Sequence, residues 1–414
     1  TTVSNNILVN CQSVEYSDNF AYISTQGIPA YPTGPFSDGN PSNAEAQNNI
    51  YKIPLNPQPN NGTPTNTTGG NIGVFINGVA LFDYRDGVAW NNNTNYLCGG
   101  PGNPPCPGGP MATQNWNRDA IPAEMGGFDC SKGHPAQGNY HHHQNPSAFK
   151  LDLEVVSDIC NLYDAEGLYA IDPENHSPLI GYAYDGYPIY GAYGYENSDG
   201  SGGITRIKSG YQLRNITTRT NGPDLDQVVT ITQGPNTGSQ ETMFLGYFRE
   251  DYEHVEHTDE EEYLDEHNGR FCITPEYPNG TYAYFATVDE NWNSAYPYAV
   301  GPTFYGVYEN RIVNTISEST TEYLSNNDFE INEVGVSIIP NPASNLIAVQ
   351  IKDLITNNLN VTLYDINGKV IKHKKIYAGS TIAYFNVQTL YNGIYLVRIS
   401  SENYSTTKRV IISR

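Results

Sequence analysis

Tight-turn dipeptides between short apolar runs constrain the fold of this chain more than any other feature of its sequence. Asn77-Gly78 lies inside the apolar segment 72–84, and Asp185-Gly186 lies inside the segment 179–194. Asn, Asp and Gly tolerate the positive φ that a two-residue turn requires. Both segments therefore predict β-hairpins.

Alternating residues predict a further strand at 279–288. Tyr282 and Tyr284 share one face of that strand, and Ala283 and Phe285 share the other. The chain of 414 residues contains 33 Tyr, 39 Gly and 27 Pro, and only 16% of its residues are charged. This composition suits many short strands joined by turns, so we predict a mainly β protein.

The charge is large, negative and uneven along the chain. The formal net charge is −23, of which residues 333–414 contribute +5, since they hold nine Lys or Arg and four Asp or Glu. Residues 1–332 therefore carry −28. The net charge of the whole chain argues against nucleic acid or an anionic membrane surface as a partner, because both are bound by clustered cations. The asymmetry predicts two separate modules.

Six cysteines, widely spaced and without a CxxC pair, favour disulfides in an oxidising compartment. We predict three bridges and prefer Cys98–Cys106 for one of them, because these two residues bracket a turn-rich loop. The pairing of the others is open, as is the alternative that they are reduced buried thiols. The candidates are Cys11, Cys98, Cys106, Cys130, Cys160 and Cys272.

No apolar run is long enough to cross a bilayer, so we predict no transmembrane segment. The chain begins at Thr1 without Met or a signal peptide, and we expect either the mature form of an exported protein or an excised portion. Residues 250–266 hold ten acids in seventeen positions. Calcium binding is one interpretation of that stretch, although it lacks EF-hand spacing, and a solvated acidic segment is the other.

The last part of the chain carries four motifs in order: Pro340-Asn341-Pro342, "LYDINGK" at 363–369, "NGIYLVRI" at 392–399 and "TKRVIISR" at 407–414. It resembles the C-terminal sorting domain of type IX secretion system cargo from Bacteroidetes. The resemblance implies a small Ig-like β-sandwich at 333–414, recognition by the secretion machinery, and an extracellular or outer cell-surface location. We predict a linker at 309–332.

Residues 70–305 resemble the YHYH-domain family. The matching segments are "IGVFINGVALFD" at 72–83, "DCSKGHPAQGNYHHHQNP" at 129–146, "HSPLIGYAYDGYPIYG" at 176–191 and "LDEHNGRFCITPEYPNGTYAYF" at 264–285. We assign this β-rich domain, with its N-terminal extension, to 1–308. The motif here is Tyr140-His141-His142-His143, so its third position departs from the family name. The resemblance implies no activity.

On a strand, His141 and His143 project from one face while Tyr140 and His142 project from the other. We predict a metal site at His141 and His143, with His134 as third ligand. The candidates for a fourth ligand are His176, Asp185 and Glu124.

Copper and zinc both suit imidazole ligands. The alternative is that these rings bond backbone carbonyls inside a Tyr-rich core. The sequence shows no Gly-x-Ser-x-Gly, His-Glu-x-x-His, P-loop or Rossmann motif, so we assign no catalytic residue.

The lead hypothesis is a secreted or cell-surface protein that binds a transition metal through its histidine cluster. The alternative is a structural or adhesive surface protein, a fibre subunit or glycan-binding adhesin that self-associates and retains its sorting domain. The abundance of tyrosine supports this alternative, because exposed Tyr supplies rigid contact area and stacks on sugar rings.

Overall fold

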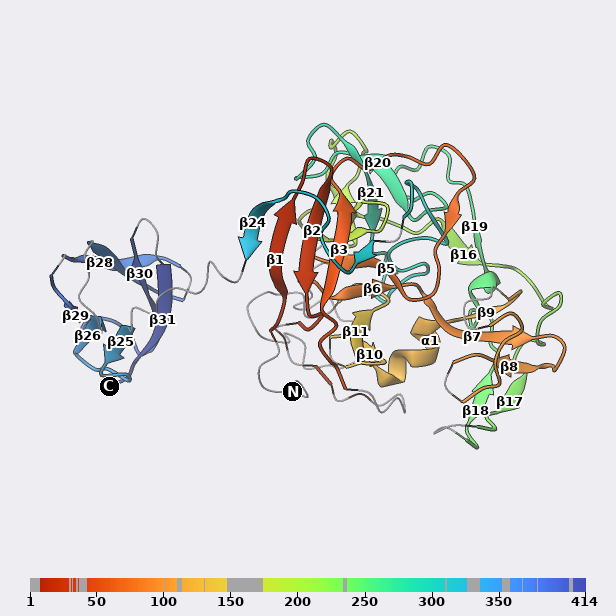
Figure 1. The fold of residues 1–414 in the computed structure, drawn as a ribbon, viewed down its shortest axis with the longest axis horizontal. Helices are drawn as coiled ribbons and strands as arrows, with labels where there is room; N and C mark the ends of the chain where they lie inside the picture. The colour runs from red at the N-terminus through yellow and green to blue at the C-terminus, as the bar shows by residue number, and fades with distance from the viewer. Residues whose placement is uncertain are drawn as a thin grey trace. The chain divides into compact units, whose positions relative to one another are not determined.

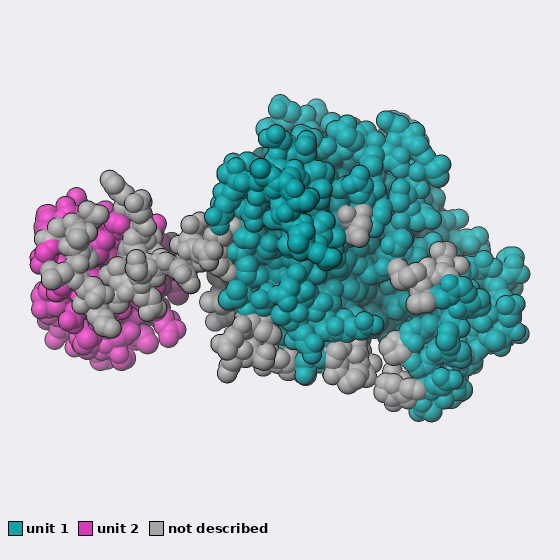
Figure 2. Space-filling view, viewed as in Figure 1, with its two compact units in different colours: residues 1–324 teal, residues 325–414 magenta. Residues whose placement is uncertain are grey.

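The computed structural model describes residues 8–29, 31, 33–34, 36, 43–100, 102–109, 114–129, 131–146, 174–233, 237–309, 311–325, 336–351, 358–366, 368–377, 379–401 and 405–414. Cys130 and Cys160 lie outside the described residues. The chain divides into two compact units, residues 1–324 and 325–414 (Figure 2). Strands dominate both units, so the prediction of a mainly β protein is confirmed.

An eight-stranded sheet is the centre of the first unit, with strand order β10-β11-β6-β5-β12-β13-β21-β20. It contains both predicted hairpins, β5–β6 around Gly78 and β12–β13 around Gly186, and each glycine has a positive φ. The strands are β5 (Asn71–Phe75), β6 (Ala80–Phe82), β10 (His134–Ala136), β11 (Asn139–His142), β12 (Leu179–Ala183), β13 (Pro188–Tyr190), β20 (Gly269–Cys272) and β21 (Thr281–Phe285).

A five-stranded sheet in the order β23-β3-β2-β1-β24 forms a second layer of this unit (Figure 1). Its strands are β1 (Cys11–Tyr16), β2 (Phe20–Thr25), β3 (Asn49–Pro54), β23 (Ile312–Val313) and β24 (Thr321–Ser325). Tyr51 and Ile53 of β3 share a buried core with Val74 and Ile189 of the eight-stranded sheet. The two sheets therefore bury their apolar faces against each other.

The segment that we predicted as a linker, 309–332, supplies two of these strands. Ile312 pairs with Tyr51 of β3, and β24 lies beside β1. Arg311 is buried and its Nε donates to the carbonyl oxygen of Tyr184. Residues 311–324 thus belong to the first unit, because strand pairing satisfies backbone groups that a solvated linker would leave to water.

Smaller sheets and short helices complete the first unit (Figure 1). The three-stranded sheet has the order β8-β7-β9, and four strand pairs surround it and the larger sheets. The remaining elements are β7 (Arg85–Asn91), β8 (Tyr96–Cys98), β9 (Asn117–Asp119), β4 (Thr65–Asn66) with β22 (Thr303–Phe304), β14 (Tyr193–Tyr195) with β15 (Ile204–Arg206), β16 (Tyr211–Leu213) with β19 (Tyr252–His254), β17 (Val228–Thr230) with β18 (Gln240–Thr242), α1 (Ala120–Glu124), and the 3₁₀ turns η1 (Met125–Gly127) and η2 (Arg249–Asp251).

Buried tyrosines hold much of this unit together. On β21, Tyr282 and Tyr284 join the main core, whereas Ala283 and Phe285 join a separate cluster, as the alternation predicted. The hydroxyl of Tyr284 donates to Asp185, and the hydroxyl of Tyr282 donates to Asp265. Tyrosine therefore fills the core here and supplies hydroxyls to buried carboxylates, which explains much of its abundance without an adhesive surface.

The second unit has two sheets, in the orders β25-β26-β29 and β28-β27-β30-β31, around one buried, mainly aliphatic core. Alternate residues of β27, Leu359, Val361 and Leu363, point into that core. The arrangement is the β-sandwich expected for this segment. Its strands are β25 (Val336–Ile339), β26 (Leu346–Ile351), β27 (Leu359–Tyr364), β28 (Val370–Ile376), β29 (Ile382–Asn386), β30 (Gly393–Ser400) and β31 (Ser405–Ile412).

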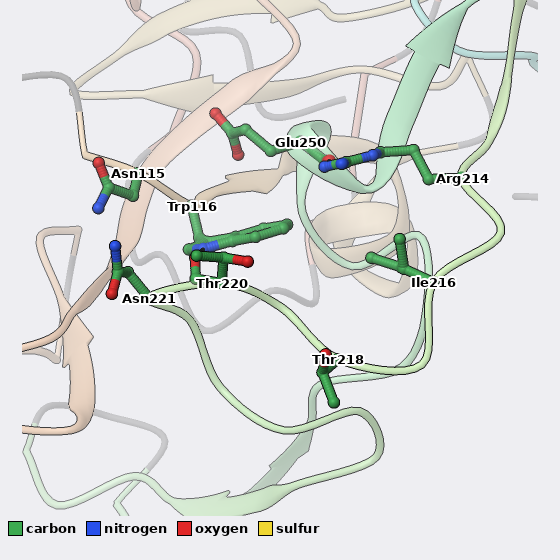
Figure 3. Close-up of a pocket in the computed structure, with 8 residues that line it drawn as sticks. All are labelled: Asn115, Trp116, Arg214, Ile216, Thr218, Thr220, Asn221 and Glu250. Atoms are coloured by element: carbon green, nitrogen blue, oxygen red, sulfur yellow. Dashed lines mark hydrogen bonds between the residues drawn. The ribbon is translucent and has the colours of Figure 1, made fainter.

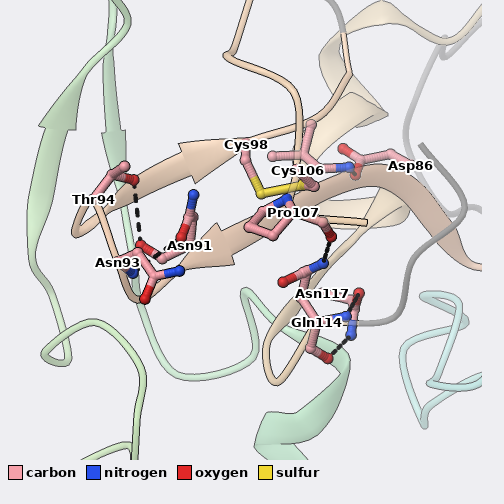
Figure 4. Close-up of a disulfide and its surroundings, with 10 residues drawn as sticks. Asp86, Asn91, Asn93, Thr94, Cys98, Cys106, Pro107, Gln114 and Asn117 are labelled. Atoms are coloured by element: carbon pink, nitrogen blue, oxygen red, sulfur yellow. Dashed lines mark hydrogen bonds between the residues drawn. A yellow bond between two sulfur atoms is a disulfide. The ribbon is translucent and has the colours of Figure 1, made fainter. Parts of the chain in front are cut away.

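One disulfide, Cys98–Cys106, is present among the described residues, and it closes the loop that follows β8 (Figure 4). This is the bridge that we preferred. Cys11 and Cys272 are free thiols, so the prediction of three bridges is wrong. Cys11 donates to the carbonyl oxygen of Ile76, and Cys272 is packed in the cluster around Phe285, so each thiol has its own environment.

The acidic stretch 250–266 is not a uniformly solvated segment. Asp251 is fully buried and forms a two-pronged ion pair with Arg219, with distances of 2.7 and 2.8 Å. Glu250 accepts from the backbone and side chain of Asn117. Other acids in the stretch are exposed, including Asp259 and Glu260. Its carboxylates point to different partners, and within the described chain they do not converge on a common site.

Candidate metal centre

A two-residue hairpin brings His134 and His141 face to face. Strands β10 and β11 pair antiparallel, with His134 directly opposite His141. The turn residues Gln137 and Gly138 have φ of 50° and 85°, as a type I′ turn requires. Residues that are directly opposite in such a pair have side chains on the same face. The turn thus places two imidazoles side by side.

His143 completes the group two residues along from His141. The three ligand nitrogens lie within 4.8 Å of one another, and all three residues are buried. The centroids of the rings are 4.6 Å apart for His134 and His141, and 4.8 Å apart for His141 and His143. The structure therefore brings together all three histidines that the sequence singled out as leading ligands.

Hydrogen bonds fix the tautomers of two of these rings. Nδ1 of His141 lies 2.9 Å from the carbonyl oxygen of Asn139, and Nδ1 of His143 lies 2.5 Å from that of Asp83. Because a carbonyl oxygen only accepts, each Nδ1 carries the proton and donates it. In the neutral rings, both Nε2 atoms then present lone pairs, and they face each other at 3.1 Å.

Two phenylalanines pack around the cluster. The Phe82 ring stacks on His141 with a centroid distance of 3.7 Å, and Phe128 meets His134 edge to face at 4.9 Å. These contacts restrict the orientation of the imidazoles and exclude water from them. Burial, followed by the neighbouring imidazoles, lowers the pKa of His141 well below its ordinary value. The ring is therefore neutral and able to act as a ligand at neutral pH.

Glu124 supplies a carboxylate to the same place. It ends α1, which begins at the N-cap Asp119, whose side chain accepts from the backbone N–H of Ile121. Oε2 of Glu124 lies 3.3 Å from Nε2 of His134 and 3.3 Å from Nε2 of His143. Burial would raise the pKa of Glu124, but hydrogen bonds and positive charge from His134 and His143 in their protonated forms lower it below its usual range, so the group is a carboxylate whenever a positive charge occupies the cluster. Of the three fourth-ligand candidates, Glu124 is the one at the cluster.

His176 and Asp185 lie elsewhere, so the suggestion that either joins the cluster is wrong. Nδ1 of His176 donates to the carbonyl oxygen of Ser177, and its ring packs against Tyr190 and Tyr195. Asp185 lies in the β12–β13 turn, where it accepts from the hydroxyl of Tyr284 and from the backbone N–H of Gly306. The core fixes each residue by contacts that sequence spacing does not reveal.

The third position of the Tyr140-His141-His142-His143 motif points away from the cluster. His142 donates from Nδ1 to the carbonyl oxygen of Lys132 and accepts at Nε2 from the hydroxyl of Tyr31. Beside it, the hydroxyl of Tyr140 donates to Asp129. This face of β11 is an internal polar network, as the alternation of a strand predicts.

Comparison with protein families identifies both parts of the chain. The model for "YHYH protein" matches residues 50–297. The chain belongs to this family. Its departure from the YHYH motif, His142, lies on the face of β11 opposite the cluster, whereas His141 and His143 retain the second and fourth positions. No curated protein matched the chain.

The model for a secretion system C-terminal sorting domain matches residues 337–413. The protein is therefore exported to the extracellular space or the outer cell surface, and its C-terminal domain interacts with the secretion machinery. No helix in the described parts of the chain is long and apolar enough to span a membrane.

Proposed function

We propose that this exported protein binds a divalent transition metal, zinc or copper, through Nε2 of His134, His141 and His143. Glu124 is the proposed fourth ligand. The donor set of three imidazoles and one carboxylate suits both metals. It contains one negative charge, which partly neutralises a divalent cation in this buried place.

The proposal rests mainly on the contact between the lone pairs of His141 Nε2 and His143 Nε2. Nε2 of His141 and Nε2 of His143 are 3.1 Å apart, and each ring donates its only proton to a backbone carbonyl. Two acceptors at this distance repel each other unless a cation or a proton lies between them, and burial disfavours protonation of His141. A metal ion removes the repulsion and leaves both Nδ1 hydrogen bonds intact.

The spacing of the donors supports the same conclusion. Metal–ligand bonds of about 2.0–2.1 Å in a tetrahedron place the ligand atoms about 3.3–3.4 Å apart. The observed separations are 3.1 Å between the two imidazoles and 3.3 Å from Glu124 to each of two imidazoles. The three imidazole nitrogens lie within 4.8 Å of one another, so coordination would draw them closer together. The hydrogen bonds to the carbonyl oxygens of Asn139 and Asp83 orient the rings as outer-shell partners do.

Coordination by four protein ligands favours a structural role for the metal. A tetrahedral ion with four protein ligands has no open position for water or substrate. Here it would tie the β10–β11 hairpin to α1. Metal binding to the native state alone would add stability, about 2.7 kcal/mol when the free metal is at a hundred times its dissociation constant.

Elemental analysis of protein purified from its native surface tests the proposal. The expected result is about one zinc or copper per chain, lost in the His141→Ala/His143→Ala protein and retained in His176→Ala, which removes a histidine outside the cluster. Circular dichroism of each variant confirms folding. A folded wild-type protein that neither contains metal nor takes it up from micromolar zinc or copper would overturn the proposal.

The Glu124→Gln variant tests whether Glu124 coordinates the metal or only lies beside it. The substitution keeps the shape and removes the charge, so metal affinity should fall at least about tenfold if Glu124 coordinates. Glu45→Gln, at a carboxylate that packs beside Gly138 instead, is the matched control. Equal affinities in the wild type and Glu124→Gln would remove Glu124 from the site and leave a three-histidine centre.

A further inference from the structure

A polar pocket of about 430 Å³ lies away from the histidines. Its walls come from Asn115 and Trp116 before β9, the loop 214–221, and Glu250 of η2 (Figure 3). The volume is within the range of small-molecule sites. None of its lining residues belongs to the candidate metal centre, so a ligand bound here would be independent of the metal.

Arg214 gives the pocket a cationic donor that is largely unused. Its Nη1 donates to the backbone oxygen of Glu250 at 3.3 Å, and within the described residues the guanidinium forms no ion pair. Backbone bonds hold its main chain in place, from Arg214 N to the oxygen of Asp251 and from Ile216 N to the oxygen of Arg214. A guanidinium on a fixed main chain, with most of its N–H groups unused, is suited to binding a carboxylate in two-pronged geometry.

Glu250 does not cancel that charge, because its carboxylate is already occupied. Oε2 accepts from the backbone N–H of Asn117 at 2.7 Å, and Oε1 accepts from the side chain of Asn117 at 2.7 Å and from Nε of Arg249 at 2.6 Å. The ion pair with Arg249 neutralises it. The ion pair also argues against a free amino acid as ligand, since a carboxylate already neutralised by Arg249 attracts an ammonium group only weakly.

The other polar groups suit a hydroxylated ligand. The side-chain amides of Asn115 and Asn221 and the hydroxyls of Thr218 and Thr220 make no hydrogen bond to any other described residue. Amides and hydroxyls both donate and accept, as sugar hydroxyls do. Figure 3 draws Asn115 and Asn221 at one end of the pocket and Arg214 at the other, with Trp116 between them.

Trp116 forms a rigid apolar part of the wall. Its Nε1 donates to the backbone oxygen of Thr220 at 3.0 Å, and the Arg219 guanidinium lies 5.7 Å from its ring. Gly222 packs against its edge, where a Cβ atom would come within 2.5 Å of Nε1. Trp116 is only 4% exposed and packs with Phe248 in a buried cluster, so it fixes the shape of the wall. The half-buried Ile216 is the apolar side chain that the pocket offers to the C–H groups of a sugar.

We propose that the pocket binds a uronic acid, either free or as a residue of a glycan. Arg214 receives the ring carboxylate, the amides and hydroxyls receive the ring hydroxyls, and Ile216 contacts the apolar C–H groups on a wall that Trp116 holds in place. A single cation matches a monoanion better than a phosphate dianion. A neutral sugar would leave the guanidinium without a counter-charge.

Isothermal titration of the full-length protein with D-glucuronate and D-galacturonate, beside D-glucose and D-galactose, tests the proposal. We expect saturable binding of at least one uronate, at least tenfold tighter than that of its neutral counterpart. Arg214→Gln should weaken uronate binding at least tenfold. Lys208→Gln, which removes a cation paired with Glu262 outside the pocket, should leave the affinity unchanged.

Thr218→Val provides a milder variant in case Arg214→Gln unfolds the loop, and it should weaken binding severalfold. Unfolding temperatures of all variants are measured in parallel. The proposal is overturned if neither uronate binds the wild-type protein, if the neutral sugars bind equally well, or if folded Arg214→Gln retains full affinity. Metal content is measured on the same samples, and because the metal ligands lie outside the pocket, the two proposals can fail separately.

Discussion

His134 lies directly opposite His141 across the β10–β11 hairpin, and the two residues are equally far in sequence from the Gln137-Gly138 turn. The two-residue turn therefore sets which residues meet. One residue more or fewer in the loop would change the register and move one imidazole to the other face. The metal centre thus depends on local backbone conformation as much as on the identity of its ligands.

Gly138→Ala should destabilise the hairpin and the centre together. Gly138 has φ of 85°, and a Cβ atom there would lie 3.0 Å from Cβ of Glu45. We expect a loss of about 1–3 kcal/mol in the free energy of unfolding, with weaker metal binding. Urea unfolding measures the loss. Gly203→Ala, where a Cβ meets no atom within 4 Å, should stay within about 0.5 kcal/mol of the wild type, and equal losses in both variants would contradict this account.

Much of the fold could be predicted from local signals. Asn77-Gly78 and Asp185-Gly186 marked hairpins because the turn type demands residues that accept positive φ. The strand β21 could be predicted because its alternate residues pack into different cores on its two faces, which gives the sequence a period of two. These signals depend on neighbours in sequence, so they survive without knowledge of the tertiary structure.

The candidate site was predictable only in part. The strand period placed His141 and His143 together, and the Gln137-Gly138 pair could have aligned His134 with His141 had it been treated as a two-residue turn. Glu124 was one of three open candidates, because its approach depends on α1 packing against the sheet. Likewise, the buried pair of Arg219 and Asp251 and the strands at 311–325 depend on contacts between distant segments, which composition does not encode.

The Cys98–Cys106 bridge should stabilise the first unit. It closes a short loop with a sequence separation of 8 residues (Figure 4). In that loop, Gly99 packs so tightly that a Cβ atom would lie 2.2 Å from the oxygen of Gly87. A loop of this length implies about 2–3 kcal/mol from the restricted unfolded chain. Urea unfolding of Cys98→Ser/Cys106→Ser should show that loss. Added reductant should lower the stability of the wild type and leave the double variant unchanged; a further loss in the variant would implicate another bridge.

The ion pair between Arg219 and Asp251 should be costly to break. Both side chains are fully buried, and Asp251 also accepts from the backbone N–H groups of Gly246 and Phe248. Arg219→Met leaves a buried carboxylate without its counter-ion, so we expect a loss of about 3–5 kcal/mol. Thermal unfolding monitored by circular dichroism gives the difference. Lys208→Met, which breaks a partly exposed pair with Glu262, should cost at most about 1 kcal/mol, and similar losses in both variants would show that burial does not govern the effect.

Acid should destabilise the metal-free protein through His142. Burial lowers the pKa of this ring to about 3, so the folded state resists a proton that the unfolded chain accepts near its ordinary value of 6.5. For a group whose folded pKa is depressed and whose charged form is the protonated one, stability is present above pH 6.5 and is lost as pH falls below it. Between pH 7 and pH 4 this residue alone should remove about 3 kcal/mol.

The measurement is urea unfolding across that pH range in the presence of a chelator, for the wild type and His142→Gln. The variant should be less stable at pH 7, because it loses the bonds to Tyr31 and to the Lys132 carbonyl, and its stability should fall less steeply toward pH 4. His257→Gln, at a more exposed ring, should keep the slope of the wild type. Parallel pH profiles for the wild type and His142→Gln would mean that other groups, and not the buried ring on the far face of β11, set the acid sensitivity of this fold.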